Sequence, residues 1–397
     1  MDRKFSPSIL QRPILLGSLA FGILGFVLPI YGKQLGASAL EIGGLFSAFS
    51  IMTVLFRPLV GWALDRFGRK RFFVAALASY SVAMALFALS GDLLGLYLAR
   101  LAQGIASSFM WISAYTIATD LASSEERGSA VGRVDEASAR GGLYGACIGF
   151  TILGFVPLLT GWRILFAGYA LTALAGAWLA WKNVPETRIA HIARTENKPS
   201  LSWPLARLML IVFVTGLSTA MVGPLLLIFL QDKFTTEVST LALASIPAAL
   251  VQSYLPSRMG RLSDRFGRAP LMAVGLAGSA LVSLLIPGLP SLMWLIVLWV
   301  LEALGWTMAA PAQEAMVADV TGSDMRGTGY GLYYLAASLG ATVGPLIGGW
   351  LYDAAGHAIP FYVNGAVLLA GVAAVLVLLR APGHQNVIAS ANLANER

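Results

Sequence analysis

The stretch GWALDRFGRKR, residues 61–71, decides the fold of this chain, because a second copy, GRLSDRFGRAP, occupies residues 260–270. The two copies are 199 residues apart in a chain of 397 residues. The same offset relates Asp120 to Asp319, which lie at matching distances beyond the two copies. A repeat at a fixed offset indicates two structural units of similar fold.

Apolar runs flank both copies and make up most of the chain. Hydrophobic residues account for 57% of the sequence and charged residues for only 12%, which is about half the charged share of a soluble domain. A helix needs about 20 residues to cross the ~30 Å hydrocarbon core of a bilayer, and the apolar runs have this length. The sequence therefore predicts an all-α polytopic membrane protein. We expect twelve transmembrane helices, at residues 13–32, 39–63, 71–90, 93–119, 129–156, 163–183, 207–231, 239–259, 270–289, 291–318, 328–352 and 359–380.

The basic residues predict the orientation of these helices. Most of the 27 Lys and Arg residues fall in loops on the same side as the two termini. Cytoplasmic loops are enriched in Lys and Arg, so we expect both termini in the cytoplasm and the protein in the cell (plasma or inner) membrane. The net charge of +7 is dispersed in short clusters, a pattern that does not favour nucleic-acid binding.

The repeat also predicts the domain organisation. An even number of helices in each copy makes the two halves parallel, related by an axis along the membrane normal. The predicted parts are an N-terminal six-helix bundle (1–184), a cytoplasmic linker (185–206), a C-terminal six-helix bundle (207–380) and a cytoplasmic tail (381–397).

The repeated stretch resembles the signature G-x-x-x-D-R-x-G-R-[KR] of the major facilitator superfamily, which follows the second span. The first copy matches it at Gly61, Asp65, Arg66, Gly68, Arg69 and Lys70, and the second copy at Gly260, Asp264, Arg265, Gly267 and Arg268. The resemblance covers essentially the whole chain. It implies a secondary transporter that alternates between inward-open and outward-open states.

The resemblance also implies gating roles for these residues. Asp65 is expected to contact the start of span eleven, and we expect Asp120 and Asp319 at the ends of spans four and ten to belong to the same gates. On the residues alone, the basic side chains could instead fix topology by binding lipid phosphates. Arg57, close to the end of span two, is expected to be structural.

Carboxylates within the predicted spans are the candidate proton carriers. An ionisable group inside a bilayer costs at least ~2.5 kcal/mol on insertion scales, so it needs a partner or a water-filled cavity. We expect Glu136, Glu302 and, less centrally, Asp135 to exchange protons as such a cavity changes sides. Glu136 and Arg140 are four residues apart on one helix, so a closed structural pair is the alternative for them.

The substrate site is expected to combine arginines with aromatic walls. Arg100 and Gln103 lie in RLAQGIASS, which resembles an R-x-x-Q-G element of the family, and they share one helix face. Arg100 or Arg140 would bind an anionic group of the substrate or neutralise the acids. Aromatic walls with few charges suit an amphipathic solute, and the alternative for each single ring is packing or anchoring at the membrane interface. The other candidate contacts are Tyr31, Trp111, Tyr115, Tyr144, Gln252, Trp306, Tyr333, Tyr334 and Asn364.

Glycine-rich stretches in spans five and eleven bear on the direction of transport. Residues 340–349, GATVGPLIGG, match G-x-x-x-G-P-x-x-G-G, whose proline-bearing form in family antiporters is characteristic of span five. In span five of this chain Ala146 replaces that proline, which weakens the antiporter assignment. We expect proton-coupled efflux of a small amphipathic organic solute. The alternatives are proton-coupled uptake of a small organic anion and a non-transporting sensor.

Catalysis is not expected. The three histidines, His191, His357 and His384, fall in predicted loops or the tail, and Cys147 is the only cysteine. These positions offer no metal-ligand cluster or Ser–His pair at membrane depth. We therefore expect no cofactor and no metal. The expected partners are the lipid bilayer, a small-molecule substrate and protons, with the protein a monomer.

Overall fold

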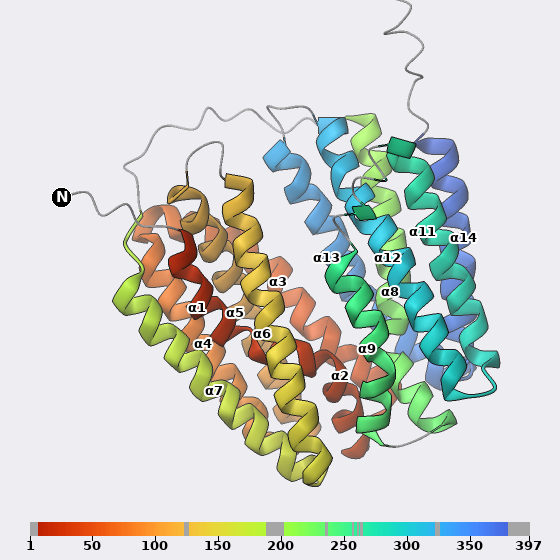
Figure 1. The fold of residues 1–397 in the computed structure, drawn as a ribbon, viewed down its shortest axis with the longest axis horizontal. Coiled ribbons are helices and arrows are strands. Elements are labelled where there is room, and N and C mark those ends of the chain that lie inside the picture. Colours follow the sequence, from red (N-terminus) through yellow and green to blue (C-terminus); the bar gives the residue numbers. More distant parts are fainter. Residues whose placement is uncertain are drawn as a thin grey trace, which may run out of the picture. The chain divides into compact units, whose positions relative to one another are not determined.

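The structure is a computed structural model that describes residues 7–122, 127–187, 202–234, 237–255, 258–259, 262, 265–321 and 326–379. The described residues are almost entirely helical and contain no β-strand, which confirms the predicted all-α class. The helices of the first half of the chain (Figure 1) are α1 (Gln11–Gly17), α2 (Leu19–Gln34), α3 (Ala39–Phe67), α4 (Arg69–Leu89), α5 (Leu93–Asp120), α6 (Arg127–Phe155) and α7 (Leu158–Asn183). Those of the second half are α8 (Trp203–Lys233), α9 (Val238–Tyr254), α11 (Arg268–Leu285), α12 (Leu292–Thr321), α13 (Arg326–Ala355) and α14 (Ile359–Leu378).

Ten helical segments in the described part of the chain are long and apolar enough to cross a membrane. One of them runs from Gln11 to Gln34 and includes both α1 and α2. Two helices that overlap predicted spans, α6 and α9, are not among the ten. α9 has only 17 residues, and α6 carries several charged residues and many glycines. The count of twelve stays a prediction.

Glycine sets the boundary between helices in both copies of the repeated stretch. Gly68 lies between α3 and α4 with φ 95°, and Gly267, its equivalent before α11, also has φ 95°. Residues with a Cβ rarely adopt this conformation, so glycine ends one helix and lets the next begin. The two copies therefore share local geometry as well as sequence.

Two compact units make up the described chain. One contains α1 to α7 together with residues 219–243 and 338–360. Its core is aromatic: Tyr31 stacks on Trp162 with 4.1 Å between ring centroids. The Trp162 indole N–H donates to the carbonyl of Phe87, and the Tyr31 hydroxyl donates to the carbonyl of Ser90. Buried Tyr and Trp side chains thus have their polar atoms satisfied, as a dry core requires.

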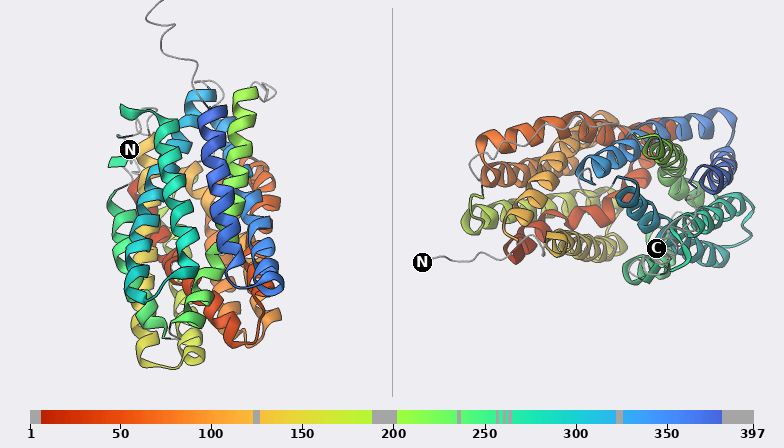
Figure 2. Two further views of the ribbon diagram at one scale, coloured as in Figure 1. Left: turned by 90° about the vertical axis from the view of Figure 1, so that its right-hand side faces the viewer. Right: turned by 90° about the horizontal axis from the view of Figure 1, so that it is seen from above.

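The other unit contains residues 202–218, 244–337 and 361–379 of the described chain. In it α11 and α14 run side by side along their lengths (Figure 2, left). Gly365 of α14 faces Leu284 of α11, and a cluster of buried apolar side chains from α8, α11, α12 and α14 fills the space between these helices. Gly275 of α11 and Gly305 of α12 lie backbone against backbone, because neither has a side chain to separate them.

Candidate functional site

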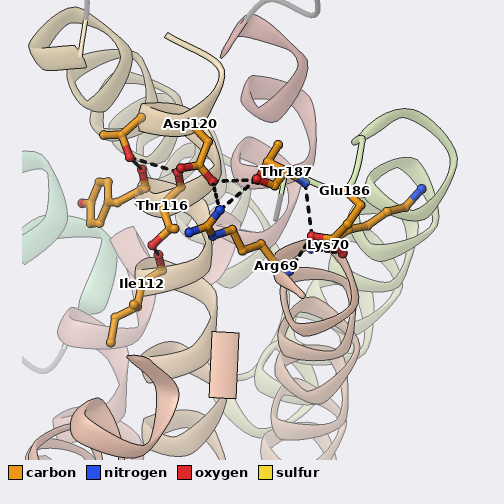
Figure 3. A network of polar contacts seen from close by, with 9 residues as sticks. Arg69, Lys70, Ile112, Thr116, Asp120, Glu186 and Thr187 are labelled. Atoms are coloured by element: carbon orange, nitrogen blue, oxygen red, sulfur yellow. Dashed lines mark hydrogen bonds and ion pairs between the residues drawn. The ribbon is translucent and has the colours of Figure 1, made fainter. Parts of the chain in front are cut away.

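A polar cluster holds the first repeated stretch against the ends of α5 and α7 (Figure 3). The guanidinium of Arg69 lies 2.7 Å from the carboxylate of Asp120 and donates to the backbone carbonyl of Thr187. The Thr187 hydroxyl donates to the same Asp120 carboxylate at 2.8 Å. The Glu186 carboxylate accepts from the backbone N–H groups of Arg69 and Lys70 at 2.7 and 3.3 Å. Residues from three separate segments thus form one network.

Glu186 and Thr187 were not predicted from the sequence, whereas Arg69, Lys70 and Asp120 were. The first N–H groups of a helix need acceptors from outside the helix. Gly68, which precedes α4, offers no side-chain acceptor, so Glu186 takes that role from a position 117 residues away. The missing cap indicates that some acceptor is needed, but not which residue supplies it.

The structure describes only some of the other predicted gating residues. Arg66 and Arg265 belong to the two repeated stretches, and the Arg265 guanidinium lies 5.4 Å from the ring centroid of Phe266. Arg57, expected to be structural, donates to the hydroxyl of Ser338 at 3.1 Å. Gly61 is a helical residue of α3, and Arg268 is the first residue of α11. Gly260, Asp264 and the side chains of Asp65 and Asp319 lie outside the described residues.

One face of α6 is exposed along much of the helix. The exposed positions recur with helical periodicity: Asp135, Glu136, Ala139, Arg140, Leu143, Tyr144, Cys147 and Ile148. The opposite face contains Gly141 and Gly145, whose missing side chains let α6 contact the backbone of α1 and α2 directly. The sequence of α6 therefore fixes which face is packed and which face carries the charges.

The exposed face of α6 carries an ion pair between Glu136 and Arg140. The side chains of Arg140 and Glu136 are 56% and 52% exposed. Asp135, the residue before Glu136, accepts a hydrogen bond of 2.6 Å from the hydroxyl of Tyr115 on α5. Charges are costly against lipid tails, so this face is suited to water or to a solute. The predicted pair therefore forms, and it forms on an accessible surface.

Arg100 lies in a different environment, inside the first unit. Only 5% of its surface is exposed. Its guanidinium donates to the side-chain oxygen of Gln103 at 2.8 Å, and the Gln103 amide donates to the hydroxyl of Tyr80. The guanidinium carbon also lies 4.6 and 5.2 Å from the ring centroids of Phe46 and Phe49. An amide and two aromatic rings thus stabilise the cation and tie α5 to α3 and α4.

A row of aromatic rings leads from this buried network toward α6. The ring of Tyr80 contacts Phe21 edge to face, with 5.4 Å between centroids. Phe21 stacks on Trp111 at 5.7 Å, and Trp111 stacks on Tyr115 at 5.9 Å. Tyr115 in turn binds Asp135. The predicted contacts Trp111 and Tyr115 therefore lie together, while Tyr31 is fully buried in the core described above.

In the second unit, Glu302 lies half-buried on α12, beside the Ser279 side chain of α11. Ser279 sits at the close contact between the two helices, next to Gly305. Two predicted contacts, Trp306 and Tyr334, have exposed side chains, as has Gln252 of α9. Among the residues predicted as proton carriers, Glu302 is the one that belongs to this unit, and its side chain lies against α11.

Asn364 and Tyr333 are buried in the second unit. The side-chain oxygen of Asn364 accepts from Ser218 at 2.6 Å, and its amide group donates to Ser283 at 2.9 Å. The Tyr333 hydroxyl lies 3.5 Å from the side-chain oxygen of Gln313. Asn364 therefore joins α8, α11 and α14, which accounts for its position without a ligand.

Within the described residues no group of three or more His, Cys, Asp or Glu side chains is arranged to hold a metal ion. Cys147 is a free thiol on the exposed face of α6. Of the groups described above, the carboxylates can exchange protons, and the guanidiniums, which stay charged, can bind anions.

A family model described as Major Facilitator Superfamily matches residues 14–207 and, separately, residues 208–393. The chain belongs to the major facilitator superfamily. The two matched segments together span nearly the whole sequence and divide it into two halves. The chain is accordingly a multi-pass membrane transporter.

Relatives of known sequence include drug-resistance proteins. Multidrug resistance protein 1 of Bacillus subtilis is 26% identical over 395 residues, covering 97% of this chain and 99% of its own. Quinolone resistance protein NorA of Staphylococcus aureus is 24% identical over 378 residues, covering 93% of this chain and 95% of its own. Both similarities extend over nearly the full length of each protein.

Solved structures share the fold of this superfamily member. The nucleoside transporter NupG has a TM-score of 0.74 at 12% identity and covers 96% of this chain and 100% of its own. A bacterial homolog of the human lysosomal transporter Spinster, in an inward-facing and occupied conformation, has a TM-score of 0.74 at 17% identity, with 93% and 94% covered. At such identities these structures show the fold alone.

Proposed function

We propose that this transporter exports a small amphipathic organic solute in exchange for protons, by alternating access. The observation that carries the proposal is the accessible Glu136–Arg140 ion pair on the exposed face of α6. A titratable pair inside a transporter needs access to water, and it can then bind and release a proton. The names of the relatives, a multidrug resistance protein and a quinolone resistance protein, support the efflux of organic solutes.

In this proposal Glu136 and Glu302 carry protons, and Asp135 assists Glu136. Arg140 neutralises Glu136 while the carboxylate is ionised, and protonation of Glu136 frees the guanidinium. The solute packs against rings that are at least partly accessible: Trp111, Tyr115, Tyr144, Trp306 and Tyr334. Such rings offer large apolar contact area with little specificity for one compound.

The proposal retains the predicted domains and orientation. The two halves, 1–184 and 207–380, move relative to each other, with the linker 185–206 and both termini in the cytoplasm. The Arg69–Asp120–Glu186 network supports movement of the first half as one part, because it joins the repeated stretch to the end of α5 and to the segment that follows α7. Asp65 serves as the predicted latch of the cytoplasmic gate.

The test is proton movement induced by solutes in proteoliposomes. The purified transporter is reconstituted with a pH dye inside, and lipophilic cations, neutral drugs and organic anions are added outside. Antiport predicts that a transported compound entering the vesicle drives proton efflux. Glu136→Gln and Glu302→Gln should reduce this efflux by about tenfold or more, because a neutral amide cannot carry a proton.

A matched control is Glu237→Gln, the same substitution at an exposed carboxylate next to α9, which should leave proton movement unchanged. Full proton efflux in both Glu136→Gln and Glu302→Gln would overturn their proposed role. Labelled solute that equilibrates with no proton movement would refute coupling to protons.

Uptake of a small organic anion with protons is the second candidate. The observation in its favour is Arg100, a buried guanidinium with an amide and two rings around it and no carboxylate among its described contacts. Entry of protons together with an anion, lost in Arg100→Gln, would establish uptake instead of efflux.

A further inference from the structure

The end of the first unit opposite the repeated stretch carries a second set of polar contacts, at the N-terminus of α3. The Ser38 hydroxyl accepts from the backbone N–H of Glu41, and the Glu41 carboxylate accepts from the backbone N–H of Ser38. Between these two residues, the backbone N–H groups of Ala39 and Leu40 donate to the carboxylate of Asp353 at 3.2 and 2.8 Å. A helix that caps itself locally thus receives its remaining acceptor from a residue 313 positions away.

Close packing of α3 against α13 brings Asp353 within reach. Gly43 of α3 lies against the backbone carbonyl of Pro345, and Gly349 of α13 lies against the backbone of Ala39 and Leu40. Neither glycine has room for a Cβ without displacing the other helix. A carboxylate held at a helix N-terminus is favourable, because the first N–H groups carry partial positive charge.

A second contact lies at the same end of the unit. Lys33 of α2 forms an ion pair with Asp232 of α8, and the hydroxyl of Tyr352, the residue before Asp353, donates to Asp232 at 3.3 Å. Lys33 and Asp232 are 199 residues apart, which is the offset of the sequence repeat. The ends of two equivalent helices therefore carry opposite charges that meet.

The Lys33–Asp232 pair joins repeat-equivalent positions, whereas the Asp353 contact has no counterpart related by the repeat. At the repeat offset, Asp353 corresponds to Gly154, and Ala39 corresponds to Val238 at the start of α9. Gly154 cannot supply a carboxylate to α9. The carboxylate that α13 offers to the start of α3 therefore has no counterpart at the repeat-equivalent position 154.

We propose that Asp353, together with the Lys33–Asp232 pair, forms a latch at the end opposite the repeated stretch, here called the far side. This far-side latch holds α2, α3, α8 and α13 together in this conformation. Its contacts must break before the transporter opens to the far side. All three charged side chains have access to solvent, so the latch can break and re-form without stranding a charge. This inference rests on the proposed alternating access, but not on proton coupling or on the identity of the solute.

The test measures opening by thiol labelling, without any solute. In a Cys147→Ser background, Met221→Cys places the single thiol on α8 at a buried position against Gly348 of α13. A membrane-impermeant maleimide applied from the far side reaches this thiol only when that side opens. Asp353→Ala should raise the labelling rate by about fivefold, the smaller end of typical coupling effects.

Asp92→Ala is the matched control, because Asp92 also caps a helix at its N-terminus but does so within its own helix, by accepting from Gly95. It should leave the labelling rate unchanged. Equal rates in the parent and in Asp353→Ala, or an equal increase in Asp92→Ala, would overturn the latch. If Asp353→Ala fails to fold, Asp353→Asn keeps the size of the side chain and should give a smaller increase.

The ion pair is tested by exchange of its charges. Lys33→Asp alone should raise the labelling rate, and Lys33→Asp combined with Asp232→Lys should lower it again. A double variant labelled as fast as the single variant would remove this pair from the latch. Because labelling needs neither solute nor protons, faster labelling without proton-coupled transport would refute the proposed function and leave the latch standing.

Discussion

Two arginines predicted to bind substrate have different surroundings. Arg140 is more than half exposed and pairs with Glu136 on the same helix. Arg100 is buried among Gln103 and two phenylalanine rings. The sequence places both residues within spans, but it does not tell which one faces the interior of a unit, because both helices carry small and apolar residues on several sides.

This difference predicts unequal effects on stability. Arg100→Ala should lower the free energy of unfolding by about 2–3 kcal/mol, because it removes a hydrogen bond to a buried charge and leaves Gln103 without its donor. Arg140→Ala should cost at most about 0.5 kcal/mol, the usual value of an exposed pair on one helix. Thermal unfolding of the two variants in the same detergent measures the difference. Shifts of equal size would contradict the assigned burial of Arg100.

Helix boundaries in the two repeated stretches follow from their glycines. The sequence predicted spans that end at residue 63 and resume at 71, whereas α3 runs to Phe67 and α4 begins at Arg69, so the break between them is shorter than predicted. The match to the family signature predicts Gly68 and Gly267 as equivalent, and both have φ 95°. Their surroundings differ. A Cβ on Gly68 would lie 2.6 Å from a carboxylate oxygen of Glu186, whereas on Gly267 its nearest contact among the described residues would be Pro270 at 3.4 Å.

Alanine at these two positions should therefore have unequal costs. Gly267→Ala should lower the free energy of unfolding by about 1–3 kcal/mol through backbone strain alone. Gly68→Ala should cost more, because the Glu186 carboxylate must also move away from the first N–H groups of α4. Thermal melting of both variants, with Glu186→Ala and the double variant Gly68→Ala/Glu186→Ala, separates the two causes. An equal loss at Gly68 and Gly267 would refute the contribution of Glu186.

For the molecule as a whole, composition was enough to predict the all-helical membrane class, and the resemblance of the repeated stretch to the family signature predicted the superfamily. The contacts between distant segments were not predictable. Glu186 reaches α4 from 117 residues away, and Asp353 reaches α3 from 313 residues away. Both are ordinary carboxylates at helix ends in the sequence, and only packing through glycines such as Gly349 shows which N–H groups they meet.

The central claim, proton-driven efflux, is tested most directly by accumulation of a labelled lipophilic cation in proteoliposomes under an imposed pH gradient. In vesicles whose linker faces outward, an acidic lumen should drive the cation inward against its concentration gradient, and a protonophore should abolish the accumulation. Equal distribution at every pH gradient would contradict coupling, and accumulation only with an alkaline lumen would show symport instead of exchange.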